Sequence, residues 1–186
     1  MLVRIRHPEK LIYPETDGKP MGENTIQFQW IITLFHGLEN LFFDRPDVFV
    51  AADLFWYPVK GDPTTVLAPD IMVVVGRPKG HRSSYKQWEE RKVAPQVVFE
   101  IESPGNTAKE KAAKKAFYRE FGVEEFYEYD PESDDLQIWL RAGKQLKAVK
   151  DVDGFVSPRL GVRFEPPAGG ALRVVRPDGR PFLTYE

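Results

Sequence analysis

The sequence predicts an α/β protein with a mixed central sheet flanked by helices and with additional antiparallel strands toward the C-terminus. Two segments, 67–76 (LAPDIMVVVG) and 97–103 (VVFEIES), are apolar on both faces apart from their acids, which is typical of central strands covered on both sides. Two segments with helical spacing, 23–43 and 104–122, precede and follow these strands. This order supplies helices for both faces of one sheet.

The first expected element is an amphipathic helix over residues 23–43. Its apolar residues recur every three or four positions and therefore share one face of a helix. This face consists of Ile26, Trp30, Leu34, Leu38 and Leu41. Pro46 is expected to end the helix, because proline lacks an amide N–H and restricts the residue before it. A strand over 48–59 and a turn at 61–63 then lead to the first buried strand.

The second helix, over residues 104–122, has recognisable signals at both ends. Thr107 and Glu110 have the spacing of a capping box, in which each side chain binds the backbone of the other residue. Gly122 suits the left-handed conformation that follows many helices. We therefore expect this helix to begin close to Thr107 and to end just before Gly122.

The chain beyond the second helix changes to short strands. Residues 124–130 (EEFYEYD) alternate between the two faces of a strand, and the polar turns that follow predict an antiparallel meander. From residue 151 onward the chain is rich in proline and glycine, and we expect irregular strands. No linker composition interrupts the sequence, so we expect one domain over 1–186, with a core at about 23–131 and a C-terminal strand extension at about 132–186.

Composition excludes several classes of function. The 186 residues include no cysteine, which excludes disulfides, thiol catalysis and cysteine-based zinc sites. The three histidines share no metal-ligand spacing, and neither a Gly-rich phosphate loop nor a nucleophilic serine motif occurs, so no organic cofactor is expected. The first twenty residues are charged and interrupted by proline, and no apolar run approaches the ~20 residues that cross a bilayer. We therefore expect a cytoplasmic protein that does not contact membranes.

One segment, 77–92 (RPKGHRSSYKQWEERK), is rich in basic and aromatic residues. The net charge of −2 disfavours general nucleic-acid binding, so any such binding must depend on a local cluster of this kind. A mixture of cations and aromatic rings can bind phosphates and stack on a base. The candidate DNA-binding residues are Arg77, Lys79, Arg82 and Lys86. A solvated basic loop is the alternative interpretation.

Glu100 and Glu102 pose the main chemical question of the sequence. Side chains two apart on a strand point to the same face, and a buried carboxylate without a partner is costly. A cation, a lysine or exposure of the strand end would each explain the pair. Asp70 opens the other buried strand and could share a hard cation with Glu100, although an acid after a proline can also serve a turn.

Lys114 is the lysine that could face this pair. It lies four residues before Tyr118, on the stripe of the second helix that should face the sheet. An ammonium group on such a stripe needs an acidic partner or a ligand, unless the long side chain extends along the stripe to solvent. We expect the ammonium of Lys114 to contact Glu100, where a cation and a lysine together could hydrolyse a phosphodiester.

These motifs occur in a fixed order along the chain. The string PDIMVVV…VVFEIESPGNTAKEKAAKKAFYREFGVEEFYEYDP resembles the bacterial putative restriction endonuclease family, a branch of the PD-(D/E)XK nuclease superfamily. The resemblance extends from about residue 12 to the end and is strongest over 69–131. It implies a single nuclease-like domain with a restriction-endonuclease-like fold.

The resemblance also implies roles for individual residues. Asp70 matches the acid of the PD element and Glu100 the acid of the (D/E)XK element, while Glu102 stands where that element has lysine. Lys114 matches a lysine displaced onto the following helix. Glu23 matches an acid that superfamily members often contribute to the site from the first core helix. An acid at this position can also act only by stabilising the helix dipole. The implied metal ligands are Asp70, Glu100 and Glu23, and the implied catalytic residues are Asp70, Glu100, Lys114 and Glu102.

The resulting hypothesis is a DNA endonuclease that depends on Mg²⁺, with Mn²⁺ able to substitute. A homodimer is expected by analogy, because cleavage of both strands usually needs two active sites. The alternative is a catalytically weak protein of the same fold that binds nucleic acid or a protein partner. A metal-dependent hydrolase of small phosphoesters fits the acids but leaves the basic segment 77–92 unexplained. The hypothesis requires Asp70 and Glu100 within reach of one cation, with 77–92 at the rim of the acidic cleft.

Overall fold

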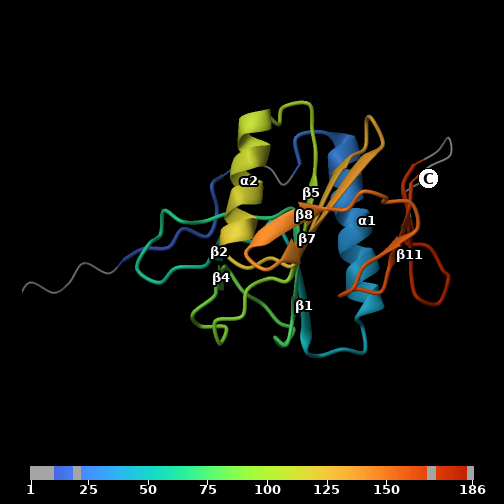
Figure 1. The fold of residues 1–186 in the computed structure, drawn as a ribbon. Helices are drawn as coiled ribbons and strands as arrows, with labels where there is room; N and C mark the ends of the chain where they lie inside the picture. The colour runs from blue at the N-terminus through green and yellow to red at the C-terminus, as the bar shows by residue number, and fades with distance from the viewer. Residues whose placement is uncertain (1–10, 19–21, 167–170, 184–186) are drawn as a thin grey trace, which may run out of the picture.

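A six-stranded mixed sheet forms the centre of the computed structural model, which describes residues 11–18, 22–166 and 171–183 (Figure 1). Its strand order is β1-β3-β5-β6-β7-β8, and only β5 and β6 are parallel. The strands are β1 (Val48–Ala52), β3 (Ile71–Val75), β5 (Val97–Ile101), β6 (Glu125–Asp130), β7 (Asp135–Ala142) and β8 (Gln145–Ala148). The mixed sheet and the antiparallel meander that the sequence predicts are both present.

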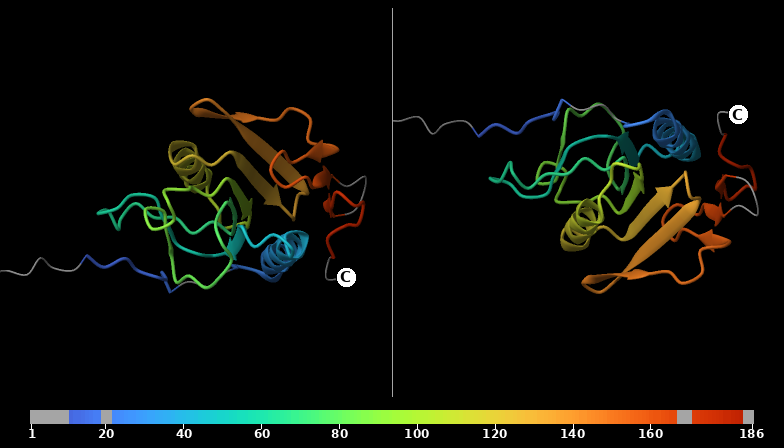
Figure 2. Two further views of the ribbon diagram at one scale, coloured as in Figure 1. Left: turned by 90° about the horizontal axis from the view of Figure 1, so that it is seen from below. Right: turned by 90° about the horizontal axis from the view of Figure 1, so that it is seen from above.

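The two helices cover opposite faces of this sheet, as Figure 2 shows. Helix α1 (Thr25–Leu41) shares its face with a small antiparallel sheet of β9 (Phe155–Val156), β10 (Arg163–Glu165) and β11 (Arg173–Val175). Helix α2 (Ala108–Glu120) shares the other face with the paired short strands β2 (Trp56–Tyr57) and β4 (Tyr85–Lys86). Neither helix of the described chain is long and apolar enough to cross a membrane. Residues 1–10, for which we also expected no spanning helix, lie outside the described residues.

Strand β5 illustrates how alternation divides the core into two clusters. All five of its residues are buried. Val97, Phe99 and Ile101 pack in the cluster that contains α1. Val98 packs in the cluster that contains α2. Because alternate side chains share a face, Glu100 points toward α2, and so does Glu102 directly beyond the strand.

Helix α1 begins two residues later than the sequence predicts. Asn24 is the N-cap, and its side chain accepts a hydrogen bond from the backbone N–H of Gln27 at 2.9 Å. The expected position of Ile26 in the core is wrong, since Ile26 is 36% exposed. The other members of the predicted stripe do face the sheet, and Ile31 joins them. The most buried apolar residues of the helix are Trp30, Ile31, Leu34 and Leu38.

The strand expected over 48–59 is divided into β1 and β2 at Asp53, whose φ of 48° is left-handed. Aspartate tolerates this conformation better than most residues do. The backbone N–H of Asp53 donates to the carbonyls of Pro69 and Asp70, each at 3.2 Å. The break therefore ties the end of β1 to the start of β3, where Asp70 lies.

Helix α2 has the ends that the sequence predicts. Thr107 accepts a hydrogen bond from the backbone N–H of Glu110, and the Glu110 side chain accepts one from the backbone of Thr107. Gly122 has a φ of 95°, in the left-handed region. The guanidinium of Arg141, on β7, donates to the carbonyls of Tyr118 and Arg119 at 3.2 and 2.7 Å. Both ends of α2 are thus fixed over the sheet.

Thr107→Ala removes the hydroxyl of the capping box and should lower the free energy of unfolding by about 1 kcal/mol. Urea denaturation followed by circular dichroism measures this change. Thr107→Ser keeps the hydroxyl and serves as the matched control, with a smaller expected loss. Equal losses in the two variants would show that the hydroxyl does not stabilise α2.

Candidate active site

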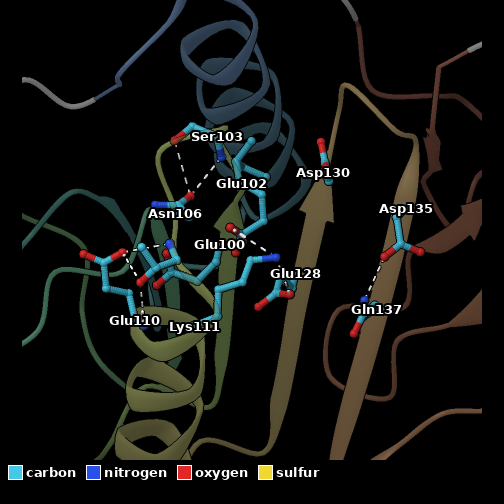
Figure 3. A network of polar contacts seen from close by, with 12 residues as sticks. Glu100, Glu102, Ser103, Asn106, Glu110, Lys111, Glu128, Asp130, Asp135 and Gln137 are labelled. Atoms are coloured by element: carbon cyan, nitrogen blue, oxygen red, sulfur yellow. Dashed lines mark hydrogen bonds and ion pairs between the residues drawn. The ribbon is translucent and has the colours of Figure 1, made fainter.

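Four carboxyl groups, three of them buried and one half-buried, gather at one end of the central strands β3, β5 and β6, on the face that α2 covers. Strand β3 begins beside the end of β5, because the two are antiparallel and Ile71 pairs with Phe99. The Asp70 carboxylate accepts a hydrogen bond from the backbone N–H of Ile101 at 2.7 Å. Glu100 pairs in register with Glu128 on the neighbouring strand β6. The fourth acid, Glu102, directly follows β5 (Figure 3).

Glu100 is the most enclosed of these acids, with 1% of its surface exposed. The Lys114 ammonium lies 2.6 Å from its Oε2 atom. The hydroxyl of the fully buried Tyr118 donates to its Oε1 atom. Lys114 and Tyr118 are four residues apart and therefore share one face of α2. The contact between Lys114 and Glu100 that the sequence predicts is present.

A second lysine of α2 faces the other two acids. The Lys111 ammonium lies 3.4 Å from Oε2 of Glu102 and 3.2 Å from Oε1 of Glu128, as Figure 3 shows. Both acids are buried. The Oε2 atom of Glu102 has no well-formed hydrogen bond among the described residues, and its ion pair with Lys111 is long. Four carboxyl groups thus face two ammonium groups.

Sequence reasoning missed Lys111, Tyr118 and Glu128 as members of this cluster. Lys111 lies three residues before Lys114, and Tyr118 lies four residues after it. Both therefore share the helix face that identified Lys114. Glu128 alternates with Phe126, which packs on the α2 side. Its position beside Glu100 depends on the register of β5 against β6, which no local pattern reveals.

Burial and neighbouring negative charge raise the pKa of three acids in the cluster. Burial raises the pKa of Asp70 well above its usual value, and the neighbouring charge of Glu100 raises it further. Burial also raises the pKa of Glu100, against the opposing attraction of Lys114. Burial and the charge of Glu128 raise the pKa of Glu102 to about 7, although Lys111 partly offsets them. Burial disfavours the charge on Lys114, but the attraction of Glu100 more than compensates. The pKa of Lys114 is therefore raised.

Glu23 does not join the acids at the end of β5. The late start of α1 leaves it before the helix, exposed, with its carboxylate hydrogen-bonded to the hydroxyl of Ser103. Among the residues that the structure describes, no group of three His, Asp or Glu side chains could hold a metal ion. The expected three-acid set of Asp70, Glu100 and Glu23 is therefore not assembled. The donors that remain for a cation are Asp70 and Glu100.

The basic segment 77–92 does not lie beside the cluster of acids, which corrects our expectation that it lies at the rim of an acidic cleft. It connects the end of β3 to the beginning of β5, whereas Asp70 and Glu100 lie at the start of β3 and the end of β5. Because these strands are antiparallel neighbours, the segment connects their other ends, away from Asp70 and Glu100. Figure 1 shows β4 and this connection near the lower end of α2, away from the upper end that β5 approaches.

The four candidate DNA-binding residues of this segment have partners within the protein. Arg77 and Arg82 both pair with Glu90, at 2.7 and 2.6 Å. Lys79 lies 3.4 Å from Glu39 of α1. The Lys86 ammonium lies 5.6 Å from the ring centre of Tyr13. The contacts of Arg77 and Arg82 lie within the segment. The segment is attached to the domain by the pairing of β4 with β2 and by the fully buried Tyr85.

Comparison with known proteins agrees with the architecture. A family model described as Uma2, putative restriction endonuclease, matches residues 15–168. The crystal structure of a putative nuclease belonging to DUF820 from Anabaena variabilis ATCC 29413 is similar, with a TM-score of 0.56. The two chains are 14% identical, and the match covers 79% of this chain and 82% of the other. No curated protein matches. The structural similarity supports the predicted fold.

Glu102→Gln should change how stability depends on pH. The folded pKa of Glu102 is about 7, above the ordinary value of 4.5. The folded state therefore binds this proton more tightly, and the free energy of unfolding falls as pH rises from about 4.5 through 7. Glutamine does not titrate, so the variant should gain stability relative to the wild type over this range, by up to about 3 kcal/mol at pH 8.

Urea denaturation in EDTA between pH 4.5 and pH 8 tests this difference. Substitution of the exposed Glu132 by glutamine is the matched control, and it should shift stability equally at both ends of the range. A difference between Glu102→Gln and the wild type that stays constant with pH would show that ionisation of Glu102 does not destabilise the folded state.

Proposed function

The chain belongs to the putative restriction endonuclease family, which confirms the resemblance of its sequence, and from this premise we propose that it is a metal-dependent DNA endonuclease. One observation carries the proposal: three buried carboxyl groups and the half-buried carboxyl group of Asp70 face only two ammonium groups. Fully ionised, this cluster has two negative charges in excess, which is a costly state for buried groups. One divalent cation would neutralise them.

The donor atoms suit such an ion. Carboxylate oxygens are the ligands that Mg²⁺ prefers, and Mg²⁺ commonly uses one or two of them together with waters and phosphate oxygens. Asp70 and Glu100 would hold the ion, and Mn²⁺ would substitute for it. When bound, such an ion lowers the pKa of a coordinated water and neutralises charge on the phosphate.

The remaining residues would act on the substrate and on protons. Lys114 keeps 30% of its side chain exposed, so its ammonium could donate to a phosphate oxygen as negative charge develops there. Glu102, with a pKa of about 7, is partly ionised near neutral pH and could accept or return a proton. Lys111 would hold Glu102 beside Glu128. A homodimer would supply two such sites for the two strands of DNA.

A specific observation favours a second candidate function. Both lysines at the site already have carboxylate partners, and Glu102 stands where the superfamily pattern has lysine. A protein of this kind could bind DNA, or a protein partner, without efficient cleavage. Lys79 and Lys86 would then be the main candidates for phosphate contacts, since Arg77 and Arg82 are committed to Glu90.

Asp70→Asn should abolish plasmid cleavage in Mg²⁺ or Mn²⁺, because the amide removes a charged donor. Lys114→Met should reduce the cleavage rate by about 10²–10³-fold, as expected for loss of a group that stabilises the transition state. Methionine fits the helix, so circular dichroism should show an unchanged fold. The rate of supercoiled plasmid nicking in single-turnover conditions measures both effects.

Lys109→Met is the matched control, because Lys109 is an exposed residue of the same helix. It should cleave at the wild-type rate. Lys111→Met and Lys115→Met complete the comparison, and smaller losses than in Lys114→Met are expected. Equal losses in the Lys111, Lys114 and Lys115 variants would indicate a diffuse phosphate-binding face and contradict the role of Lys114.

The second candidate function predicts a different result for DNA binding. If Lys79 and Lys86 each contact a phosphate, Lys79→Gln with Lys86→Gln should lower the slope of log affinity against log salt by about 2. Asp70→Asn should leave that slope unchanged. Fluorescence anisotropy of a labelled duplex at several salt concentrations measures the slope, and an unaltered slope in the double variant removes the segment from DNA binding.

A further inference from the structure

Tyr118 places a hydroxyl inside an apolar cluster. The residue is fully buried, and its ring lies 5.1 Å from the ring of Phe126 and 6.1 Å from that of Phe117. Burying a hydroxyl without a hydrogen bond is unfavourable, and phenylalanine would fill the same space without this cost. The only described partner of the hydroxyl is Oε1 of Glu100. The hydroxyl of Tyr118 therefore provides a hydrogen bond to Glu100, and the packing does not require it.

The two donors from α2 divide the Glu100 carboxylate between them. Tyr118 donates to Oε1, and Lys114 donates to Oε2 at 2.6 Å. Both donors project from one face of a helix whose ends are fixed by the capping box and by Arg141. Two fixed donors determine the rotation of the carboxylate plane. Each carboxylate oxygen has two lone pairs, so each retains one for another ligand.

We propose that Tyr118 is a positioning residue that orients the Glu100 carboxylate for cation binding. This inference rests on the proposed metal-dependent function and assigns Tyr118 a part in it without contact with substrate. Groups that hydrogen-bond a metal-binding carboxylate typically change metal affinity by about 10–100-fold when they are removed. Tyr118→Phe should therefore weaken cation binding within this range.

The same sheet offers a closely matched control on its other face. Tyr127 is also fully buried, and its hydroxyl donates to the carboxylate of the buried Glu125 at 2.6 Å. Glu125 also accepts hydrogen bonds from the Ser157 hydroxyl and the backbone N–H of Arg159. Tyr127→Phe thus removes the same atom beside a buried carboxylate, at a place remote from the proposed cation. Any general effect of the substitution should appear in both variants.

Isothermal titration calorimetry with MnCl₂, on the full chain without DNA, tests the proposal. Tyr118→Phe should raise the dissociation constant of Mn²⁺ by about 10–100-fold. Tyr127→Phe should change it less than about twofold. Introducing Tyr118→Phe into a Glu100→Gln background should cause no further loss, because Tyr118 acts through Glu100. The increase in unfolding temperature on adding Mn²⁺ gives a second readout for each variant.

Each other outcome has a definite meaning. Unchanged Mn²⁺ affinity in Tyr118→Phe would overturn the positioning role and leave the proposed function intact. Equal weakening in Tyr118→Phe and Tyr127→Phe would show a general structural effect and would also overturn it. If the wild type binds no Mn²⁺, the proposed metal-dependent function fails, and the role of Tyr118 fails with it.

Discussion

The gathering of four carboxyl groups, three of them buried, on one face of the sheet is the constraint on which the rest of this site depends. Each carboxylate needs a partner, since an uncompensated buried charge is costly. Helix α2 supplies the side-chain partners of the three glutamates through one face, from Lys111, Lys114 and Tyr118. Asp70 instead accepts a hydrogen bond from the backbone of β5. The position of α2 over β5 and β6 therefore sets the charge balance as well as the packing.

This dependence explains why distant parts of the chain matter to the site. Arg141 on β7 binds the last carbonyls of α2, so a strand without a candidate catalytic residue helps to place Lys114. On the opposite face, Glu125 of β6 binds Ser157 and Arg159 and so attaches the C-terminal strands to the sheet. Strand β6 thus carries one buried acid for the site, Glu128, and another that anchors the C-terminal extension.

Local patterns predicted those features that depend on neighbouring residues in the sequence. Alternation placed Glu100 and Glu102 on one face, and the capping box placed the start of α2. Longer-range features could not be predicted in this way. Glu128 reaches the cluster only through the register of β5 against β6, and Glu23 misses it because α1 begins two residues later than its pattern suggests. Glu90 was visible in the basic segment 77–92, but only the folded loop shows that it pairs with both Arg77 and Arg82.

The acid at position 102 can be understood from the same charge balance. The superfamily pattern has a lysine on the strand, whereas here the strand bears an acid and the facing helix bears the lysines. Glu102 requires a cation, which Lys111 provides, and Lys111 in turn lies between Glu102 and Glu128. A lysine at position 102 would leave three carboxyl groups beside three ammonium groups and so remove the excess of negative charge. Glu102 therefore contributes to the excess negative charge that the proposed divalent cation would neutralise.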